Sequence, residues 1–258
     1  ILSSFGVLAQ ASEKVVMDTG GEDTEGRQYD NPSTMWKQQL EEQGGESKWY
    51  AKAYDFWAKQ EASVSGVLGG YSATNEPDLS ESLQFLDLLG RITSPPTFGS
   101  VLDAGAGIGR ITQGCLLKKF ESVDLVESDA RYVETAKKNL AGTGAANFFC
   151  APIQAFSFAG RSYDVIWNQW VLLYLTDDHL VSYLQRCRSA LRPDGVICVK
   201  ENVVLKGNFV VDNDDNSITR TDGHYKEIFK QAGLQLILEK RQLRWPTDLF
   251  PVMMYALR

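Results

Sequence analysis

From Ser100 to the end of the 258-residue chain, short apolar runs alternate with segments of helical pattern, and this alternation limits the possible folds more than any other feature. The runs predicted to be strands are SVLDAG, SVDLVE, NFFC, YDVIWNQW, VICVKEN, LQLILEKRQ and PVMMYALR. The segments predicted to be helices are residues 110–120, 130–141, 177–191 and 221–232. Strands that alternate with helices favour a mainly parallel sheet. The sequence therefore predicts a Rossmann-like α/β fold, a seven-stranded sheet with helices on both faces.

The first 95 residues have a different character and divide into two parts. Residues 1–33 contain the polar, glycine-rich stretch DTGGEDTEGRQYDNPS, which is typical of a flexible N-terminal tail. Residues 34–95 contain three helical patterns, with the glycine-rich loop GVLGGY between the second and the third. We expect this part to form a helical lid that keeps water out of a core domain at residues 96–258.

The motif LDAGAGIGR joins the first predicted strand to the first helix of that core, so it stands where a glycine loop can bind a ligand. Gly105, Gly107 and Gly109 have the spacing GxGxG, whereas the dinucleotide fingerprint that binds a pyrophosphate is GxGxxG. Asp103 precedes the first glycine, and a carboxylate there would repel phosphate groups. Both features indicate a ligand that lacks phosphates.

Glu127 ends the second predicted strand, at the place where an acid accepts hydrogen bonds from ribose hydroxyls in nucleotide-binding folds. A nucleoside ligand without phosphates points to S-adenosylmethionine. The alternative is that Glu127 only caps the following helix. We favour the cofactor because Glu127 occurs together with Asp103 and the GxGxG loop.

Composition excludes several other classes of protein. The formal net charge of −7 and the sequence NQWV after the fourth strand, in place of an N/D-P-P-Y/F motif, argue against a nucleic-acid partner. No apolar run approaches the roughly 18 residues of a membrane span. With two histidines and no cysteine–histidine cluster, we expect no metal site. We further expect a monomer located in the cytoplasm or nucleus.

Several motifs resemble those of the protein α-N-terminal methyltransferases, which methylate the amino group of proteins that begin X-Pro-Lys. They are WYAKAYDFW, GVLGGY, LDAGAGIGRIT, SYDVIWNQWVLLYLTDDHL, RPDG, KEN, DDNS and YALR. The resemblance covers residues 49–258. It implies a class I methyltransferase fold, S-adenosylmethionine as methyl donor and protein or peptide N-termini as substrates.

The resemblance also implies a set of cofactor contacts. Arg110 would pair with the methionine carboxylate, and Gln169 would contact the methionine portion. Ser128 and Asp129 would face the adenosine, while Ile153 and Gln154 would contact the adenine edge. Ordinary loop polarity is the alternative for the two glutamines. The predicted cofactor-binding residues are Gly105, Gly107, Arg110, Glu127, Ser128, Asp129, Ile153, Gln154 and Gln169.

Three residues match the family's catalytic positions. An α-amine has a pKa of about 7.7–8.0, so a base that removes its proton promotes attack on the methyl group. Asp215 is the predicted base, and Asn202 is the amide that would anchor the first residue of the substrate. Tyr174 stands where the family usually has a histidine. Because a phenol with a pKa near 10 is a poor base, Asp215 must carry more of the proton transfer.

The segment from residue 201 to residue 222 contains five acidic and two basic residues, and it follows the fifth strand. It would attract the basic third residue of the substrate, although a solvated acidic loop is the alternative. An indole at Trp170 suits stacking on the proline. The other residues that match the family's peptide channel, some of which could equally be core residues, are Trp49, Leu68, Asp212, Ser217, Leu249 and Phe250.

The sequence thus predicts an S-adenosylmethionine-dependent methyltransferase acting on the α-amino group of protein N-termini. Two alternatives stay open. One is a small-molecule methyltransferase, because the same core serves many acceptors. The other is a non-catalytic protein that binds S-adenosylmethionine or a peptide, which the tyrosine at position 174 leaves possible.

Overall fold

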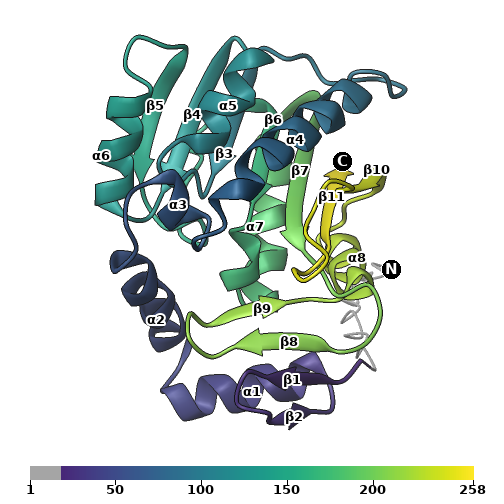
Figure 1. Ribbon diagram of the computed structural model, residues 1–258. Coiled ribbons are helices and arrows are strands. Elements are labelled where there is room, and N and C mark those ends of the chain that lie inside the picture. Colours follow the sequence, from purple (N-terminus) through teal and green to yellow (C-terminus); the bar gives the residue numbers. More distant parts are fainter. Residues whose placement is uncertain (1–18) are drawn as a thin grey trace, which may run out of the picture.

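The computed structural model describes residues 19–258, and a seven-stranded sheet forms its centre (Figure 1). The strands of this sheet are β3 (Ser100–Ala104), β4 (Ser122–Glu127), β5 (Ala145–Cys150), β6 (Tyr163–Gln169), β7 (Leu191–Asn202), β10 (Leu236–Arg241) and β11 (Val252–Leu257). Their order is β10-β11-β7-β6-β3-β4-β5. Strands β3 to β7 are parallel to one another, and β11 is antiparallel to β7 and β10. The predicted mainly parallel, Rossmann-like sheet is confirmed.

Helices cover both faces of this sheet because successive strand residues point to opposite sides. Val101, Val165 and Val196 belong to a buried cluster with side chains of α4 (Asn75–Leu89), α5 (Arg110–Gly114) and α6 (Ala130–Asn139). Their neighbours Leu102, Ile166 and Ile197 belong to a second cluster with side chains of α7 (Asp177–Ser189) and α8 (Asp222–Gln231). The sheet thus has a hydrophobic core on each face.

The predicted single helix over residues 110–120 is wrong. The α-helix ends at Gly114, and a separate 3-10 helix, η2 (Leu116–Lys118), follows. A side chain at Gly114 would meet Leu79 of α4 at 2.5 Å, so the close packing of α4 requires a glycine there. Glycine is also a poor residue for continuing a helix, and the break follows directly.

A second, smaller sheet lies apart from the large one and joins distant parts of the chain (Figure 1). Its order is β2-β1-β8-β9, from β1 (Gly21–Asp23), β2 (Gln28–Tyr29), β8 (Phe209–Asp212) and β9 (Ser217–Thr219). The predicted tail at residues 1–33 is therefore wrong for its second half, because residues 21–23 and 28–29 are strands. Residues 1–18 lie outside the described part.

The described part of the N-terminal region is mostly helical. Its helices are α1 (Pro32–Gln43), α2 (Glu46–Ala58), α3 (Val64–Val67) and the 3-10 helix η1 (Ser72–Thr74), followed by α4. Asn31 caps α1 by accepting a hydrogen bond from the Thr34 backbone, and Pro32 occupies the first turn, where its missing N–H costs nothing. Within the described residues, no helix combines the length and the apolar character needed to cross a membrane.

Candidate active site

A cavity of about 550 Å³ opens at the carboxyl ends of β3, β4 and β6, the edge where parallel sheets of this kind bind ligands. Its volume suits a nucleoside-sized ligand. Every one of the nine predicted cofactor residues lines it. They are Gly105, Gly107, Arg110, Glu127, Ser128, Asp129, Ile153, Gln154 and Gln169. The sequence prediction of which residues meet here therefore agrees with the structure.

The glycine loop forms the floor of this cavity. Gly105 has φ +72°, and a Cβ there would lie 2.6 Å from the side chain of Val171, so no larger residue fits. The backbone N–H of Gly107 donates to a carboxylate oxygen of Glu127 at 2.9 Å. The other oxygen of Glu127 accepts from the Asp129 backbone at 2.9 Å and the Ser128 hydroxyl at 3.0 Å. Glu127 therefore ties the loop after β3 to the turn after β4.

A buried ion cluster lies behind the opposite end of the cavity, and its centre is Asp78 of α4, a residue that sequence reasoning missed. The Asp78 carboxylate lies 2.7 Å from Arg110 and 2.5 Å from Lys200, and the Gln169 amide donates to it at 2.9 Å. Burial opposes ionisation, but Lys200 and then Arg110 hold the pKa of Asp78 below its ordinary value. One carboxylate faces two cations, so the cluster favours one further anion beside Arg110.

Asp103 lies at the end of β3, directly before the glycine loop that begins at Gly105. Its side chain is buried and accepts a hydrogen bond of 2.6 Å from the Thr112 hydroxyl. Burial raises the pKa of Asp103 to about 6. A positively charged ligand in the cavity would favour the ionised form of this carboxyl group.

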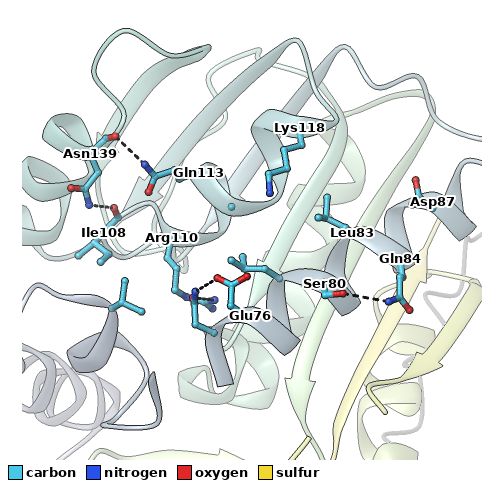
Figure 2. Close-up of a pocket in the computed structure, with 14 residues that line it drawn as sticks. Glu76, Ser80, Leu83, Gln84, Asp87, Ile108, Arg110, Gln113, Lys118 and Asn139 are labelled. Carbon is cyan, nitrogen blue, oxygen red and sulfur yellow. Dashed lines mark hydrogen bonds between the residues drawn. The ribbon is translucent and has the colours of Figure 1, made fainter. Parts of the chain in front are cut away.

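Arg110 also borders a second, open pocket between α4 and α5 (Figure 2). The rim of this pocket is polar. Gln113 donates to the backbone of Asn139, and Gln84 donates to Ser80. None of the predicted site residues other than Arg110 lines it. The cavity at the strand ends is therefore the one that the sequence motifs mark.

Helix α2 lines one side of the cavity. The hydroxyl of Tyr54 accepts a hydrogen bond from the Gln154 amide at 2.7 Å. Arg131 donates to the backbone oxygen of Trp57 at 3.0 Å. Sequence reasoning missed Tyr54, Trp57 and Arg131. The spacing of Tyr50, Ala53 and Trp57, three and four residues apart, is the signal that places Trp57 on the inward face of α2.

Two of the three predicted catalytic residues, Tyr174 and Asp215, meet at the rim of the cavity. The Tyr174 hydroxyl lines the cavity and donates to Asp215 at 3.1 Å, while the indole N–H of Trp57 donates to the same hydroxyl at 2.8 Å. Burial raises the pKa of Tyr174 well above 10 and raises the pKa of Asp215 above its ordinary value. Tyr174 is therefore a neutral donor, and Asp215 is the group that can take a proton.

Trp170 and Asn202 also meet beside the cavity. The indole N–H of Trp170 donates to the Asn202 amide oxygen at 3.2 Å, and Trp170 has φ +52°, an uncommon conformation for a large residue. Its ring lies 5.8 Å from that of Trp245 in the β10–β11 loop, a residue that sequence reasoning missed. The guanidinium of Arg110 lies 5.6 Å from the Trp170 ring.

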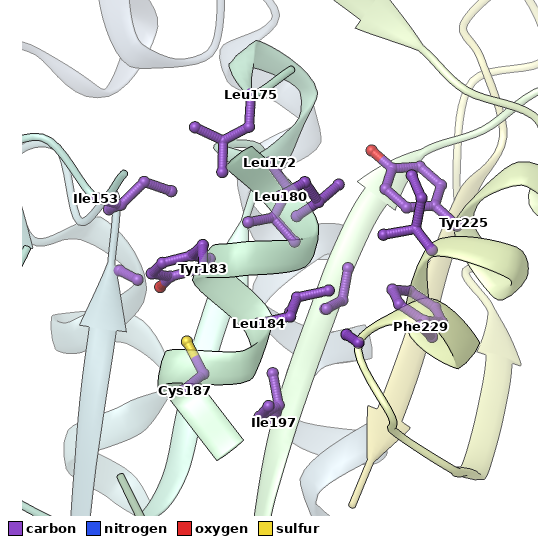
Figure 3. Close-up of a cluster of buried hydrophobic side chains, with 14 of the residues drawn as sticks. Ile153, Leu172, Leu175, Leu180, Tyr183, Leu184, Cys187, Ile197, Tyr225 and Phe229 are labelled. Carbon is purple, nitrogen blue, oxygen red and sulfur yellow. The ribbon is translucent and has the colours of Figure 1, made fainter. Parts of the chain in front are cut away.

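A buried carboxyl group anchors the loop that carries Trp170 and Tyr174. One oxygen of Glu201 accepts the backbone N–H groups of Val171 and Leu172, at 2.9 Å and 2.8 Å. Leu172 packs into the hydrophobic cluster under this loop, shown in Figure 3. Burial raises the pKa of Glu201 to about 8. The loop is thus fixed both by a carboxyl group and by apolar packing.

The remaining predicted residues lie outside the cavity lining. Asp212 and Ser217 face each other as a pair across the β8–β9 hairpin, and the Ser217 backbone donates to Asp215. Leu249 and Phe250 are in the β10–β11 loop, where Phe250 is 41% exposed. Trp49 and Leu68 are buried, and Trp49 packs edge-on against Trp36 at 4.9 Å.

Trp49 therefore packs as a core residue, the alternative that the sequence left open. Its indole N–H also donates to the backbone oxygen of Tyr174 at 2.9 Å, which supports the loop that carries Trp170 and Tyr174. Across residues 19–258, no group of histidine, cysteine, aspartate or glutamate side chains has the arrangement of a metal site.

Known proteins share both the sequence and the fold. A family model described as AdoMet dependent proline di-methyltransferase matches residues 45–258. Alpha N-terminal protein methyltransferase 1 of Arabidopsis thaliana is 42% identical in an alignment 254 residues long that covers 93% of this chain and 91% of that protein. N-terminal Xaa-Pro-Lys N-methyltransferase 1-B of Xenopus laevis is 41% identical over 216 residues, 83% of this chain and 96% of that protein.

Among solved structures, a SAM-dependent methyltransferase from Leishmania major superposes with a TM-score of 0.87 at 39% identity, covering 94% of this chain and 97% of that one. A magnesium protoporphyrin IX methyltransferase from Synechocystis with bound SAM shares the fold, with a TM-score of 0.58 at 13% identity, over 82% of this chain and 94% of that one. Since the family model spans most of the chain, this protein belongs to the AdoMet dependent proline di-methyltransferase family.

Proposed function

We propose that this protein transfers methyl groups from S-adenosylmethionine to the α-amino group of protein N-termini of the Xaa-Pro-Lys type. A relative named alpha N-terminal protein methyltransferase 1 and a relative named N-terminal Xaa-Pro-Lys N-methyltransferase 1-B are 42% and 41% identical over most of the chain. The observation that carries the proposal is the contact between Tyr174 and Asp215, which joins a cofactor-sized cavity to a base at its rim.

The residues of the cavity fit S-adenosylmethionine. Glu127 can accept the ribose hydroxyls, and the net positive cluster of Arg110, Lys200 and Asp78 suits the methionine carboxylate. Asp103 offers a carboxylate for the positively charged part of the ligand. When bound, the cofactor supplies an electrophilic methyl group on a cationic sulfur. The protein's own part is to hold it, exclude water with α2 and present the amine.

Asp215 performs the proton transfer in this proposal. An α-amine must lose its proton before it can attack, and Asp215 is the carboxylate at the rim. Tyr174 cannot accept the proton at neutral pH because burial raises its pKa. Its hydroxyl instead donates to Asp215 and keeps one carboxylate oxygen oriented toward the cavity rim. Asn202 would accept a hydrogen bond from the first residue of the substrate.

Substrate selection rests on two further features. Asp212 and Asp215 lie at the turn of the β8–β9 hairpin and would attract the lysine at the third position. The indole of Trp170, beside Arg110 and Trp245, offers an aromatic surface for the proline at the second position. The absence of nucleic-acid and membrane partners, the monomeric state and the location in the cytoplasm or nucleus stay predictions.

A peptide assay tests the proposal. The purified protein is incubated with S-adenosylmethionine and a peptide beginning Ser-Pro-Lys, and the same peptide with an acetylated amino terminus is the matched control. We expect mass spectrometry to show added methyl groups on the free peptide only. Methylation of the blocked peptide would contradict an α-amine acceptor. Cofactor binding without methylation of any peptide would favour the non-catalytic alternative.

A further inference from the structure

The segment from Gly20 to Gln43 precedes the family match, which begins at residue 45, yet its strand β1 pairs with the β8–β9 hairpin that carries Asp215. Strand β1 adds to β8 in parallel, with Gly21 opposite Phe209 and Asp23 opposite Val211. Figure 1 shows β1, β2 and α1 on the outer side of β8 and β9, away from the large sheet. The segment therefore touches the substrate side of the site without lining the cofactor cavity.

The contact between β1 and β8 is close and specific. A Cβ at Gly21 would lie 2.0 Å from the ring of Phe209, so only glycine allows the strands to approach. Tyr29 stacks on the same ring with centroids 6.3 Å apart. At the end of β8, the Asn213 backbone N–H donates to the Thr24 hydroxyl at 3.0 Å. The segment thus contacts β8 along its length and as far as Asn213, the first residue of the hairpin turn.

A chain of hydrogen bonds continues from this sheet to the end of the turn. Asn216 donates to Gln43 at 2.6 Å, and Gln43 donates to Gln39 at 2.7 Å. Gln39 donates to the Tyr29 hydroxyl at 2.7 Å, which donates to Asp23 at 2.8 Å. The chain ends on the Asp23 carboxylate, and Gln43 also donates back to the Asn216 amide oxygen at 3.4 Å, so the Gln43 and Asn216 amides are paired in both directions.

Asn216 is the point where this chain meets the site. It is fully buried with φ +53°, a conformation that Asn adopts more readily than most residues, and it also donates to the backbone oxygen of Trp49 at 3.0 Å. Its neighbour in sequence is Asp215, whose carboxylate accepts from Tyr174. Because Asn216 is held in place, the adjacent backbone of Asp215 is also held, and this sets the direction in which the Asp215 side chain points.

We propose that residues 20–43 are a positioning segment for the acceptor site, in which Gln43 acts through Asn216 to hold Asp215 against Tyr174. The proposal rests on the function proposed above for Asp215. It assigns a task in the reaction to a part of the chain outside the family match. Gln43 is a positioning residue, because it touches neither cavity nor substrate residues directly.

The variant Gln43→Ala tests this, with Gln38→Ala as control because Gln38 is exposed on the same helix. We expect Gln43→Ala to lower kcat for a Ser-Pro-Lys peptide about tenfold, the size of one lost hydrogen bond to a buried group. Binding of S-adenosylhomocysteine, measured by calorimetry, should not change. The acidic limb of the pH–rate profile should move to higher pH, because the bond from Tyr174 lowers the pKa of Asp215.

If Gln43 had a purely structural role, Gln43→Ala would lower the melting temperature without moving the acidic limb of the pH–rate profile. If Gln43→Ala and Gln38→Ala share the wild-type kcat and pH profile, the inference is wrong. The milder variant Thr24→Val, which removes the partner of the Asn213 backbone at an exposed position, serves if Gln43→Ala fails to fold. We expect Thr24→Val, like Gln43→Ala, to make the protein a poorer enzyme for the peptide, with a higher KM or a lower kcat.

Hydrogen–deuterium exchange separates this inference from the proposed function. Amides of residues 213–217 should exchange faster in Gln43→Ala than in the wild type and Gln38→Ala, whether or not the peptide is a substrate. Unchanged exchange there would overturn the positioning role. A wild-type protein that shows the expected exchange but methylates no peptide would instead contradict the proposed function.

Discussion

The hydroxyl of Tyr174 donates a hydrogen bond of 3.1 Å to Asp215 while it accepts one of 2.8 Å from the indole of Trp57. The two bonds fix the direction of the phenolic proton, which must lie toward the carboxylate. A tyrosine can therefore stand where the family usually has a histidine without acting as a base itself. In the proposed reaction the base is Asp215, and Tyr174 donates to it from the cavity side.

The first prediction concerns Asp215 itself. Asp215→Asn keeps the size of the side chain but cannot accept a proton, so we expect kcat for a Ser-Pro-Lys peptide to fall by about 100-fold or more. The dissociation constant of S-adenosylhomocysteine should stay within error, because Asp215 lies outside the cavity lining. Steady-state kinetics and calorimetry measure the two. Asp214→Asn, at the exposed neighbouring position, is the control, and near-wild-type turnover by Asp215→Asn would contradict the assignment.

The second prediction concerns Tyr174. Tyr174→Phe leaves the Trp57 indole and the Asp215 carboxylate without their shared partner, so we expect kcat/KM for the peptide to fall about tenfold. Because the bond from Tyr174 lowers the pKa of Asp215, the acidic limb of the pH–rate profile should move to higher pH. Tyr174→His, which restores the usual family residue, should retain activity. Equal profiles for wild type and Tyr174→Phe would show that the hydroxyl has no part in the reaction.

The third prediction tests the ribose acid. Glu127→Ala removes the carboxylate that meets the Gly107 backbone and the Asp129 backbone, so we expect the cofactor to bind about 10- to 100-fold more weakly. Calorimetric titration with S-adenosylhomocysteine measures this. Glu134→Ala, on the outer face of α6, should bind it like the wild type. If Glu127→Ala bound S-adenosylhomocysteine as tightly as the wild type, Glu127 would not be a cofactor-binding residue.

The fourth prediction compares two glycines of one loop. Gly105→Ala and Gly107→Ala both place a side chain at positive φ, but only the first meets Val171, at 2.6 Å. We expect thermal unfolding to show a clearly larger loss of melting temperature for Gly105→Ala. Adding Val171→Ala should restore part of that loss. Equal melting temperatures for the two single variants would contradict the close contact.

The fifth prediction concerns Glu201 and pH. Because burial raises its pKa to about 8 from an ordinary 4.5, the folded protein keeps a proton that the unfolded chain has already lost. The free energy of unfolding should therefore fall as the pH rises from about 5 to about 8. Glu201→Gln keeps an acceptor for the Val171 and Leu172 backbones but cannot ionise, so its stability should depend less on pH in this window. Urea unfolding at several pH values measures both slopes, and parallel slopes would contradict the buried, protonated carboxyl group.

The parts of the fold that the sequence predicts are those with a local signal. The strands around Gly105 and Glu127 are apolar runs next to turns, and their functional residues stand at fixed places relative to the strand ends. The same holds for Gln169, the last residue of β6. For such residues the position along the strand already determines the edge of the sheet on which the side chain lies.

The parts that the sequence does not predict depend on partners far along the chain. Strand β1 is the polar tripeptide Gly21–Asp23, with no periodicity to mark it, and it exists only because β8 offers an edge. Asp78 reads as an ordinary acid in the first turn of an amphipathic helix. Only the tertiary fold brings Lys200 and Arg110 to it. Likewise, the Trp170–Trp245 contact joins two loops whose sequences carry no common pattern.

The pairing of β1 with β8 has a consequence for the order in which the molecule assembles. Residue 21 faces residue 209, so the whole parallel part of the large sheet lies between the two strands along the chain. Closing so long a loop costs more entropy than forming the helices and neighbouring strands within it, so the small sheet should assemble last and open first. The half of the enzyme that receives the peptide can then loosen and close again while the half that holds the methyl donor stays folded.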